Sequence, residues 1–434
     1  MLDQILAAGL HPASASLTVD GHGDLPSAFA VTELAVATVG AAGLAVADLL
    51  GIADVHVDRR LASMWFGMSI RPDGWAPPPP WDPVAGDYRT ADGWIRLHTN
   101  APVHRDAALR VLGVAGTREA VADAVAGWAG DALEDAVVAA GGCAAVMRTA
   151  ADWAAGPAGS SVLGEPLIDW TTSGAAPLDL ALAPARPLAG LRVLDLTRVL
   201  AGPVATRFLA LLGADVLRID PPWWDEPGVI PEVMLGKRTA RLDLTTEPLA
   251  ELLTGADVLV HGYRPGALDG LGLGADARWQ LSPGLVDVSL DAYGWTGPWR
   301  GRRGFDSLVQ MSTGIADAGM RHYGHDSPTP LPVQALDHGT GYLLAFAALQ
   351  GVARRLATGE GASARLSLAR TAALLTGPPA DGSLEPERPQ DVAPAVEHTS
   401  WGPARRLVAP VAIDGVRWET DRPARSLGSD RAAW

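Results

Sequence analysis

The chain has 434 residues, with 34 lysines and arginines against 49 aspartates and glutamates, which gives a formal net charge of −15. This length predicts two to three domains, and the acidic balance argues against nucleic acid or an anionic membrane as a partner. The single cysteine, Cys143, excludes an internal disulfide framework and zinc clusters built on cysteine pairs. The N-terminus lacks a basic, apolar leader pattern, so we expect a cytoplasmic protein.

The longest apolar stretch runs from Leu34 to Ala47, between Glu33 and Asp48. It is shorter than the roughly 20 residues that a membrane-spanning helix needs. We therefore expect a buried helix of the fold in this part of the chain.

A proline-rich stretch, APPPPW, marks the start of a separate unit. After it, strand-like residues flank Asp92 and Gly93, a pair that is typical of a hairpin turn. Val121 and Val125 then recur at helical spacing. These signals predict a small α+β domain over residues 80–160.

From residue 188 to 375, short apolar runs alternate with helical segments, the pattern of parallel strands joined by crossover helices. The first strand, Arg192–Leu196, leads through a turn to a helix opened by Pro203 and stopped by Gly213. Further strands are expected at Asp215–Ile219, Arg241–Leu244, Asp257–His261 and Leu285–Leu290. The predicted fold class is α/β, with a Rossmann-like doubly wound parallel sheet in residues 188–375 and the smaller α+β domain before it.

An internal repeat pairs residues 21–66 with 324–375 in order, length and apolar pattern. Two explanations stay open: alanine-rich helices resemble one another, or a gene fusion or permutation left two copies of one helix-strand unit. On the second explanation, residues 1–75 are a degenerate repeat of 324–375. A second proline-rich stretch makes 376–394 a linker, and we expect 395–434 to pack on the large domain as a C-terminal tail.

The turn after the first strand, TRVLAGP, could be a dinucleotide site, because phosphates favour helix N-termini and Asp220 ends the second strand where a ribose-binding acid belongs. The turn carries only Gly202 where that motif needs three glycines, so NAD binding is disfavoured. The sequence contains no Walker A, H-E-x-x-H or G-x-S-x-G pattern. We therefore predict no metal and no serine nucleophile from local motifs, although dispersed metal ligands stay open.

Loops that follow the expected strands carry an ordered set of motifs. In chain order they are LTRVLAGP, LGKRTARLDL, HGYRPGAL, AYGWTGPWRGRRGFD and ALDHGTG. Together they resemble family III CoA-transferases, the CaiB/BaiF group that includes carnitine and bile-acid CoA-transferases, formyl-CoA transferase and α-methylacyl-CoA racemase. The close resemblance covers about 188–375. More loosely, 80–160 is similar to the family's small domain, which here precedes the Rossmann half instead of following it.

The resemblance implies that Asp337, in LDHGTG, is the nucleophile of an acyl-CoA transferase that moves CoA between carboxylic acids. An aspartate in this role attacks the thioester, forms a mixed anhydride and releases CoA thiolate, which returns to make an aspartyl-CoA thioester. Taken without the other motifs, Asp337 is instead a helix cap. In the first repeat Val31 lies near the matching position, so that copy is expected to lack a nucleophile.

The same resemblance implies a set of CoA contacts. A phosphorylated, extended anion requires basic side chains, backbone N–H groups and an apolar face for its base. The matching positions are Arg198, Val199 and Ala201 in the first turn, Lys237 and Arg238 for phosphate, Leu244 and Tyr263 for adenine and ribose, and Arg303. Each basic residue has an alternative role as a solvated surface charge. We expect an acyl-CoA and a carboxylate acceptor as substrates, no permanently bound cofactor, and a homodimer or a pairing with a related subunit.

Two other functions stay open. In the racemases of this family a histidine falls at the position of Phe305, and phenylalanine cannot carry a proton. A non-catalytic CoA-binding partner subunit is the other alternative, because the glycine-rich loop of the formyl-CoA members has no counterpart here. Pro221, Pro222 and Gly270 also replace basic residues that some members carry.

Overall fold

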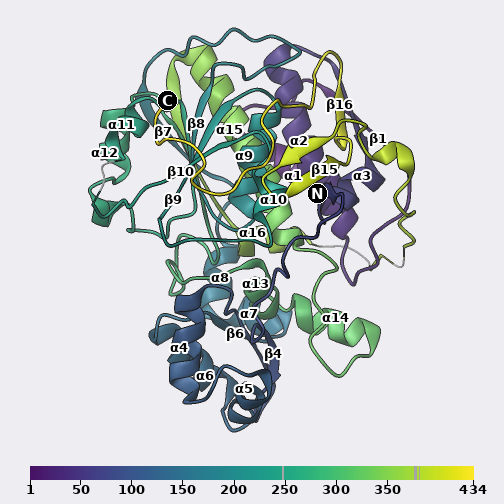
Figure 1. The fold of residues 1–434 in the computed structure, drawn as a ribbon, viewed down its shortest axis with the longest axis vertical. Coiled ribbons are helices and arrows are strands. Elements are labelled where there is room, and N and C mark those ends of the chain that lie inside the picture. Colours follow the sequence, from purple (N-terminus) through teal and green to yellow (C-terminus); the bar gives the residue numbers. More distant parts are fainter. Residues whose placement is uncertain (247–248, 376–378, 381) are drawn as a thin grey trace.

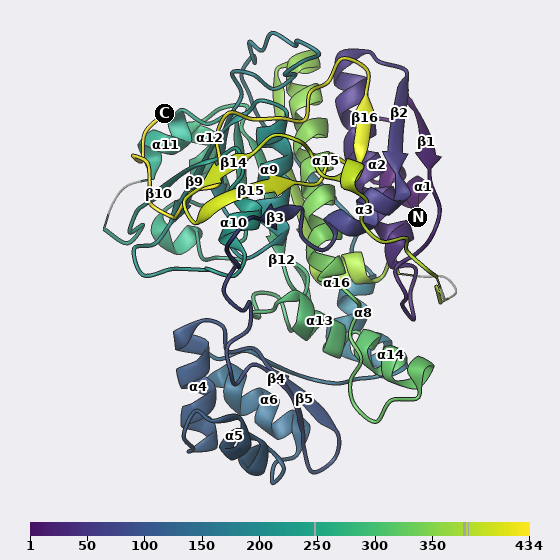
Figure 2. The ribbon, with the colours of Figure 1, turned by 45° about the vertical axis from the view of Figure 1, so that its right-hand side comes forward.

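The computed structural model describes residues 1–434 except 247–248, 376–378 and 381 (Figure 1). Part of the linker expected at 376–394 therefore lies outside the described residues. The described chain forms a large body built on a seven-stranded sheet, with a smaller unit below it in Figures 1 and 2.

The large body is organised around this sheet, whose order is β10-β9-β8-β11-β12-β13-β7. The strands are β7 (Asp169–Ala175), β8 (Arg192–Leu196), β9 (Asp215–Asp220), β10 (Arg238–Arg241), β11 (Val258–His261), β12 (Val286–Asp291) and β13 (Glu360–Ser367). All neighbours pair in parallel except β7, which is antiparallel to β13. Numbered from β8 to β13 in chain order, the six parallel strands have the order 3-2-1-4-5-6 in the sheet. This is the Rossmann order, so the predicted Rossmann-like fold class is confirmed.

Helices cover both faces of the sheet, which explains why its strands read as nearly continuous apolar runs. Val193 of β8 packs into a core cluster with α9 (Ala201–Leu211) and α15 (Ala335–Thr358). Its neighbour Leu194 points to the opposite face, into the cluster of α11 (Ala250–Thr254). Alternate residues of one strand thus stabilise two separate layers of helices.

The strand predicted at Arg241–Leu244 begins and ends three residues earlier than expected, because the chain turns after Arg241. The Asp243 carboxylate accepts hydrogen bonds from the backbone N–H and the hydroxyl of Thr245 at 3.0 and 2.7 Å. An aspartate that bonds the backbone two residues ahead favours a turn over a strand. The other predicted strands agree with β8, β9, β11 and β12 within one residue at each end.

The smaller unit is a three-stranded antiparallel sheet with helices on it. It comprises β4 (Gly86–Arg89), β5 (Trp94–Leu97), β6 (Ala144–Val146), α4 (Pro102–Leu112), α5 (Arg118–Val125) and α6 (Gly130–Ala139). The predicted hairpin turn at Asp92 and Gly93 joins β4 to β5. The Asp92 carboxylate accepts bonds from the Thr90 hydroxyl at 2.9 Å and the Gly130 N–H at 2.8 Å, so it ties the turn to the start of α6.

The two ends of the chain combine in two further three-stranded sheets, β1-β2-β16 and β14-β15-β3. Their strands are β1 (Ser16–Asp20), β2 (Asp54–Asp58), β3 (Ile70–Pro72), β14 (Glu397–Thr399), β15 (Gly402–Arg406) and β16 (Val411–Ile413). The remaining helices are α1 (Leu2–Ala7), α2 (Val31–Leu50), α3 (Arg59–Trp65), α7 (Ala150–Ala155), α8 (Pro157–Leu163), α10 (Ile230–Val233), α12 (Ala275–Leu281), α13 (Asp306–Ser312), α14 (Ile315–Tyr323) and α16 (Leu368–Ala372), with 3-10 turns at Asp269–Leu271 and Pro389–Asp391. The C-terminal strands therefore complete sheets that N-terminal strands begin.

The repeated segments have the same local structure, in which α2, β2 and α3 follow one another as α15, β13 and α16 do. The residues before the two long helices share one conformation, with φ −75° and ψ 62° at Ala30 and φ −74° and ψ 64° at Gln334. Counting from these residues places Glu33 opposite Asp337. Val31, which was expected near the matching position, lies two residues before Glu33.

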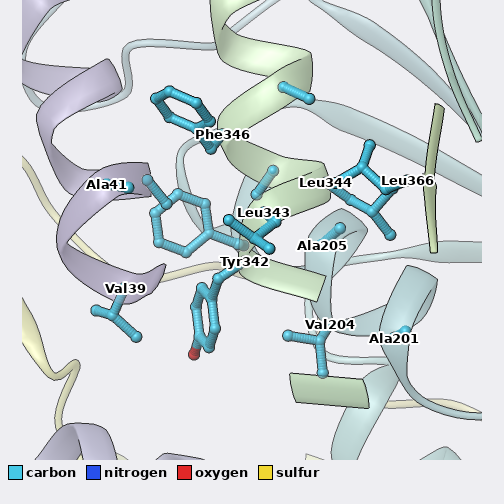
Figure 3. Close-up of a cluster of buried hydrophobic side chains, with 14 of the residues drawn as sticks. Val39, Ala41, Ala201, Val204, Ala205, Tyr342, Leu343, Leu344, Phe346 and Leu366 are labelled. Atoms are coloured by element: carbon cyan, nitrogen blue, oxygen red, sulfur yellow. The ribbon is translucent and has the colours of Figure 1, made fainter. Parts of the chain in front are cut away.

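The two long helices lie side by side in the core of the large body (Figures 1 and 2). By length and composition α2 could cross a membrane, but most of its residues are buried inside the fold, as the apolar stretch predicted. Figure 3 shows Val39 of α2, Tyr342 of α15 and Val204 of α9 in one apolar cluster. This packing fixes the N-terminal end of α15, where Asp337 lies.

Candidate functional site

A cavity of about 870 Å³ opens where the carboxyl ends of the central strands meet the small unit. Its walls include the loops after β8, β9, β11 and β12, the start of α15, and residues 101–104 of the small unit. The strand order reverses between β8 and β11, and open α/β sheets bind ligands at such a switch point. The expected site residues on this wall are Arg198, Val199, Ala201, Tyr263, Arg303 and Asp337.

Asp337 occupies the third position of α15 and is 7% exposed. Its backbone N–H and that of Leu336 donate to the carboxylate of Asp306 at 3.0 and 2.9 Å. Asp306 in turn accepts a bond from the Gln310 side chain. Asp306 thus satisfies two N–H groups at the start of α15 and holds the residue that carries the candidate nucleophile.

The electrostatics of this pair favour the protonated acids. Burial raises the pKa of Asp306 to about 6. Burial, and then the charges of Asp306 and Glu226, raise the pKa of Asp337 well above its ordinary value. An ionised Asp337 is therefore a carboxylate that the fold does not solvate, which suits a group that reacts with an electrophile.

The turn between β8 and α9 is tightly constrained. Val199 has φ 63°, a left-handed conformation that is an outlier for a β-branched residue. Its N–H donates to the carboxylate of Glu226 at 2.6 Å. A Cβ on Gly202 would lie 2.3 Å from the side chain of Thr197, so only glycine fits there. The motif TRVLAGP therefore specifies one backbone shape on the cavity wall.

The structure does not bring Lys237, a predicted phosphate contact, to the cavity wall. Its ammonium is fully buried and bonds the Asp195 carboxylate at 3.2 Å and the carbonyl of Pro203 at 2.9 Å. Burial lowers the pKa of Lys237 to about 8, although the charge of Asp195 opposes the shift. This lysine fixes α9 to β8 instead of binding a ligand.

Arg238 and Leu244, two more of the expected CoA contacts, also lie off the cavity wall. The guanidinium of Arg238 pairs with both oxygens of Asp215 at 2.9 and 2.8 Å. Leu244 packs against the apolar cluster of α11. Both side chains contact other parts of the fold at the edge of the sheet. Sequence spacing alone does not show in which direction these side chains point.

Three arginines on the cavity wall have no acidic partner in the described part of the chain: Arg198, Arg264 and Arg303. Arg198 lies over the rings of Trp224 and Tyr263, at 4.8 and 5.7 Å from their centroids. Basic groups without acidic partners on a cavity wall favour an anionic ligand.

His104 and Asp291 are among the wall residues that the sequence analysis did not identify. His104, from α4, lies edge-on to Phe305, and burial followed by the charge of Arg303 lowers its pKa to about 4. Asp291, the last residue of β12, has a pKa raised to about 7 by burial. His104 belongs to α4 of the small unit, outside the motifs of residues 188–375 from which the site was predicted.

Comparison with known proteins agrees with this geometry. The model of CoA-transferase family III matches residues 188–406, half of the chain. The chain belongs to CoA-transferase family III. The matched region contains the six-stranded parallel part of the sheet and every cavity loop that follows one of its strands.

Individual relatives match different fractions of this chain. It is 34% identical over 190 residues to the probable fatty acyl-CoA transferase Rv3272 of Mycobacterium tuberculosis, covering 40% of this chain and 48% of that protein. It is 28% identical over 398 residues to an acyl-CoA transferase of Gibberella moniliformis, covering 78% of this chain and 70% of that protein. A crystal structure of a CaiB/BaiF family protein from Brucella suis matches with 26% identity and a TM-score of 0.41, over 50% of this chain and 65% of that one. The chain spans about half the length, or less, of the first two curated relatives that it matches.

Proposed function

We propose that this protein is an acyl-CoA transferase in which Asp337 is the nucleophile. The observation that carries the proposal is the position of its buried carboxyl group on the wall of a cavity that is also lined by three arginines without acidic partners among the described residues. An acyl-CoA brings both an electrophilic carbonyl and a set of phosphates, so it fits both features. A carboxylic acid is the acceptor of the CoA.

The reaction proceeds by exchange at the Asp337 carboxyl group. The carboxylate attacks the thioester carbonyl, the C–S bond breaks, and CoA leaves as a thiolate while a mixed anhydride forms. The thiolate then attacks the aspartyl carbonyl and releases the first carboxylic acid, which leaves an aspartyl-CoA thioester. The acceptor carboxylate repeats both steps in reverse, so the product acyl-CoA forms and Asp337 is regenerated.

The surroundings of Asp337 serve this chemistry in two ways. Burial leaves its carboxylate poorly hydrated, which strengthens it as a nucleophile. Residues 101–104 of the small unit complete the cavity wall opposite the Rossmann loops, so the small unit restricts the access of water to the anhydride. Arg303 and Arg198 provide charge for the CoA phosphates.

Replacement of Asp337 by asparagine tests the assignment. We expect Asp337→Asn to lose transferase activity by several orders of magnitude, with ~10⁶ as an upper guide from nucleophile deletions in other enzymes. Hydroxylamine should inactivate the wild-type protein only when acyl-CoA is present, because only the anhydride and thioester forms react. Near wild-type turnover by Asp337→Asn, or inactivation independent of acyl-CoA, counts against a covalent aspartyl intermediate.

One observation favours a second candidate, an α-methylacyl-CoA racemase. Phe305 stands where those enzymes are expected to have a histidine, but His104 lies against the Phe305 ring and on the cavity wall. Its low pKa keeps it neutral and able to accept a proton at pH 7. Exchange of the α-proton of a 2-methylacyl-CoA with D₂O, lost in His104→Gln, would favour this reaction over CoA transfer.

A further inference from the structure

Among the described residues, Val199 is the only one other than glycine with a positive φ, and it lies on the cavity wall. Its φ of 63° occurs in the turn between β8 and α9. This left-handed conformation is unfavourable for a β-branched residue and persists only where the surrounding structure holds it. The contacts of Val199 must therefore supply that hold.

The loop between β9 and α10 contacts two consecutive residues of this turn. The Val199 N–H donates to the Glu226 carboxylate at 2.6 Å. One residue earlier, the Arg198 guanidinium lies over the Trp224 ring, 4.8 Å from its centroid. Glu226 and Trp224 belong to the same loop, so the shape of the turn depends on this loop.

Glu226 is itself fixed by a buried ion network. Its second carboxylate oxygen accepts a bond from Arg218 at 2.8 Å, and Arg218 donates to both oxygens of Asp220 at 2.8 and 3.0 Å. The side chains of Arg218 and Asp220 are 0% exposed, and that of Glu226 is 8% exposed. Asp220, which a dinucleotide site would use for ribose, is thus occupied by an arginine of its own strand. A carboxylate held in this network is a rigid acceptor for the Val199 N–H.

Given the proposed function, on which this inference rests, we propose that Glu226 is a positioning residue of the transferase. Its carboxylate keeps Val199 left-handed and so places Arg198 on the cavity wall that also carries Asp337. Glu226 is not among the residues that line the cavity, so it acts on a substrate through the turn. Without the bond, Val199 is expected to return to a negative φ, which redirects the chain on both sides and moves Arg198 relative to Asp337.

Two variants separate the bond from the charge. The charge of Glu226 also raises the pKa of Asp337, so loss of activity alone would not identify the cause. Glu226→Gln removes the charge but keeps a carbonyl oxygen that can accept the Val199 N–H. Glu226→Ala removes both.

Turnover of the full chain with the best acyl-CoA of a panel tests the positioning role. We expect Glu226→Ala to lower kcat/KM by about 5- to 150-fold, the range that corresponds to strain at one such residue, and Glu226→Gln to retain most of it. Val199→Gly in the Glu226→Ala background should restore activity, because glycine adopts a φ of 63° without a side-chain penalty. Glu119→Ala, which alters an exposed acid of α5, is the control.

Hydrogen exchange of the Val199 amide, followed by mass spectrometry, tests the contact without activity. Exchange should be faster in Glu226→Ala than in the wild type and in Glu226→Gln. Circular dichroism checks each fold. If Glu226→Ala does not fold, Glu226→Asp, which keeps the charge on a shorter side chain, takes its place and should show the same loss and rescue.

Equal losses of activity in Glu226→Gln and Glu226→Ala, or no rescue by Val199→Gly, overturn the positioning role while the proposed function stands. Unchanged exchange of the Val199 amide in Glu226→Ala overturns the hold on the turn, whether or not the protein is active. Absence of turnover by the wild-type protein with every acyl-CoA of the panel overturns the proposed function.

Discussion

At the scale of single residues, Asp337 combines two opposing demands. As the proposed nucleophile it must ionise, yet burial and the nearby acids Asp306 and Glu226 disfavour its charge. Because the pKa in the folded state is raised above that of the unfolded chain, the folded state binds the proton more tightly. The resulting stabilisation is complete below the unfolded pKa and is lost as the pH rises through the folded pKa.

Asp337→Asn should therefore stabilise the fold while it removes activity. We expect its thermal midpoint to exceed that of the wild type by a few degrees at pH 8, and the difference to shrink towards pH 4 as Asp337 takes up its proton. Scanning calorimetry from pH 4 to 8 measures this, with the exposed Asp106→Asn as control. A midpoint below that of the wild type at pH 8 would contradict the buried-charge account.

The charge of Asp306 offers a second test at this scale. Removing it should lower the pKa of Asp337, because the nearby negative charge raises that pKa. In Asp306→Asn the amide oxygen can still accept the N–H groups of Leu336 and Asp337. We expect the rising limb of the pH–rate profile to shift to lower pH. An unmoved limb with a lower maximal rate would assign Asp306 a structural role alone.

At the scale of elements, the close crossing of α15 and α9 positions Asp337, the proposed nucleophile, against the turn that follows β8. A Cβ on Gly341 would lie 2.6 Å from the carbonyl oxygen of Ala201 and 2.8 Å from Val204. Both partners are parts of the cluster in Figure 3 and lack space to retreat. The glycine is thus needed for contact between the helices and not for backbone freedom.

Gly341→Ala should push the two helices apart. Overpacking of this kind costs about 1 to 3 kcal/mol of unfolding free energy, measurable by urea denaturation. It should also lower the maximal transferase rate, because Asp337 shifts relative to the turn of Val199. Gly270→Ala, where an added Cβ meets nothing within 4 Å, is the control. Equal stability of the two variants would contradict the close crossing.

The elements that the sequence predicted well are those whose own residues specify them. β8 follows from its apolar run, and the turn after it from the glycine and proline of TRVLAGP. Lys237 and Arg238 were expected to contact CoA, but their side chains pair within the fold. Lys237 pairs with Asp195, far away in the chain, and Arg238 pairs with Asp215 of the neighbouring strand. His104 was missed for the same reason, since only tertiary packing brings it to the site.

At the scale of the whole molecule, distant segments meet at one buried carboxylate. Glu232 of α10 pairs with Arg207 of α9 and with Arg406 of β15, and accepts the N–H groups of Ser69 and Ile70. Burial alone would raise the pKa of Glu232, but the two arginines lower it to about 2. The sequence predicted that the C-terminal tail packs on the large domain, but it could not predict this anchor.

Glu232→Gln should leave the buried guanidinium of Arg207 without an acidic partner among the described residues, whereas Arg406 keeps its ion pair with Glu397. We expect a loss of about 3 to 5 kcal/mol in unfolding free energy, the usual consequence of breaking a buried ion pair from one side. Denaturant unfolding compares it with Glu251→Gln, which alters an exposed acid of α11. A loss below 1 kcal/mol would mean that Arg406 and Arg207 do not depend on Glu232.

The central claim is that Asp337 carries CoA during turnover, and peptide mass analysis tests it most directly. Wild-type protein is mixed with a panel of acyl-CoAs, quenched in acid and digested, and the peptide that contains Asp337 is examined. We predict a mass increase equal to CoA less one water on that peptide. Hydroxylamine should release the CoA and leave an aspartyl hydroxamate, and the adduct should be absent in Asp337→Asn. A CoA adduct on any other residue, or turnover without an adduct under these conditions, would contradict the account.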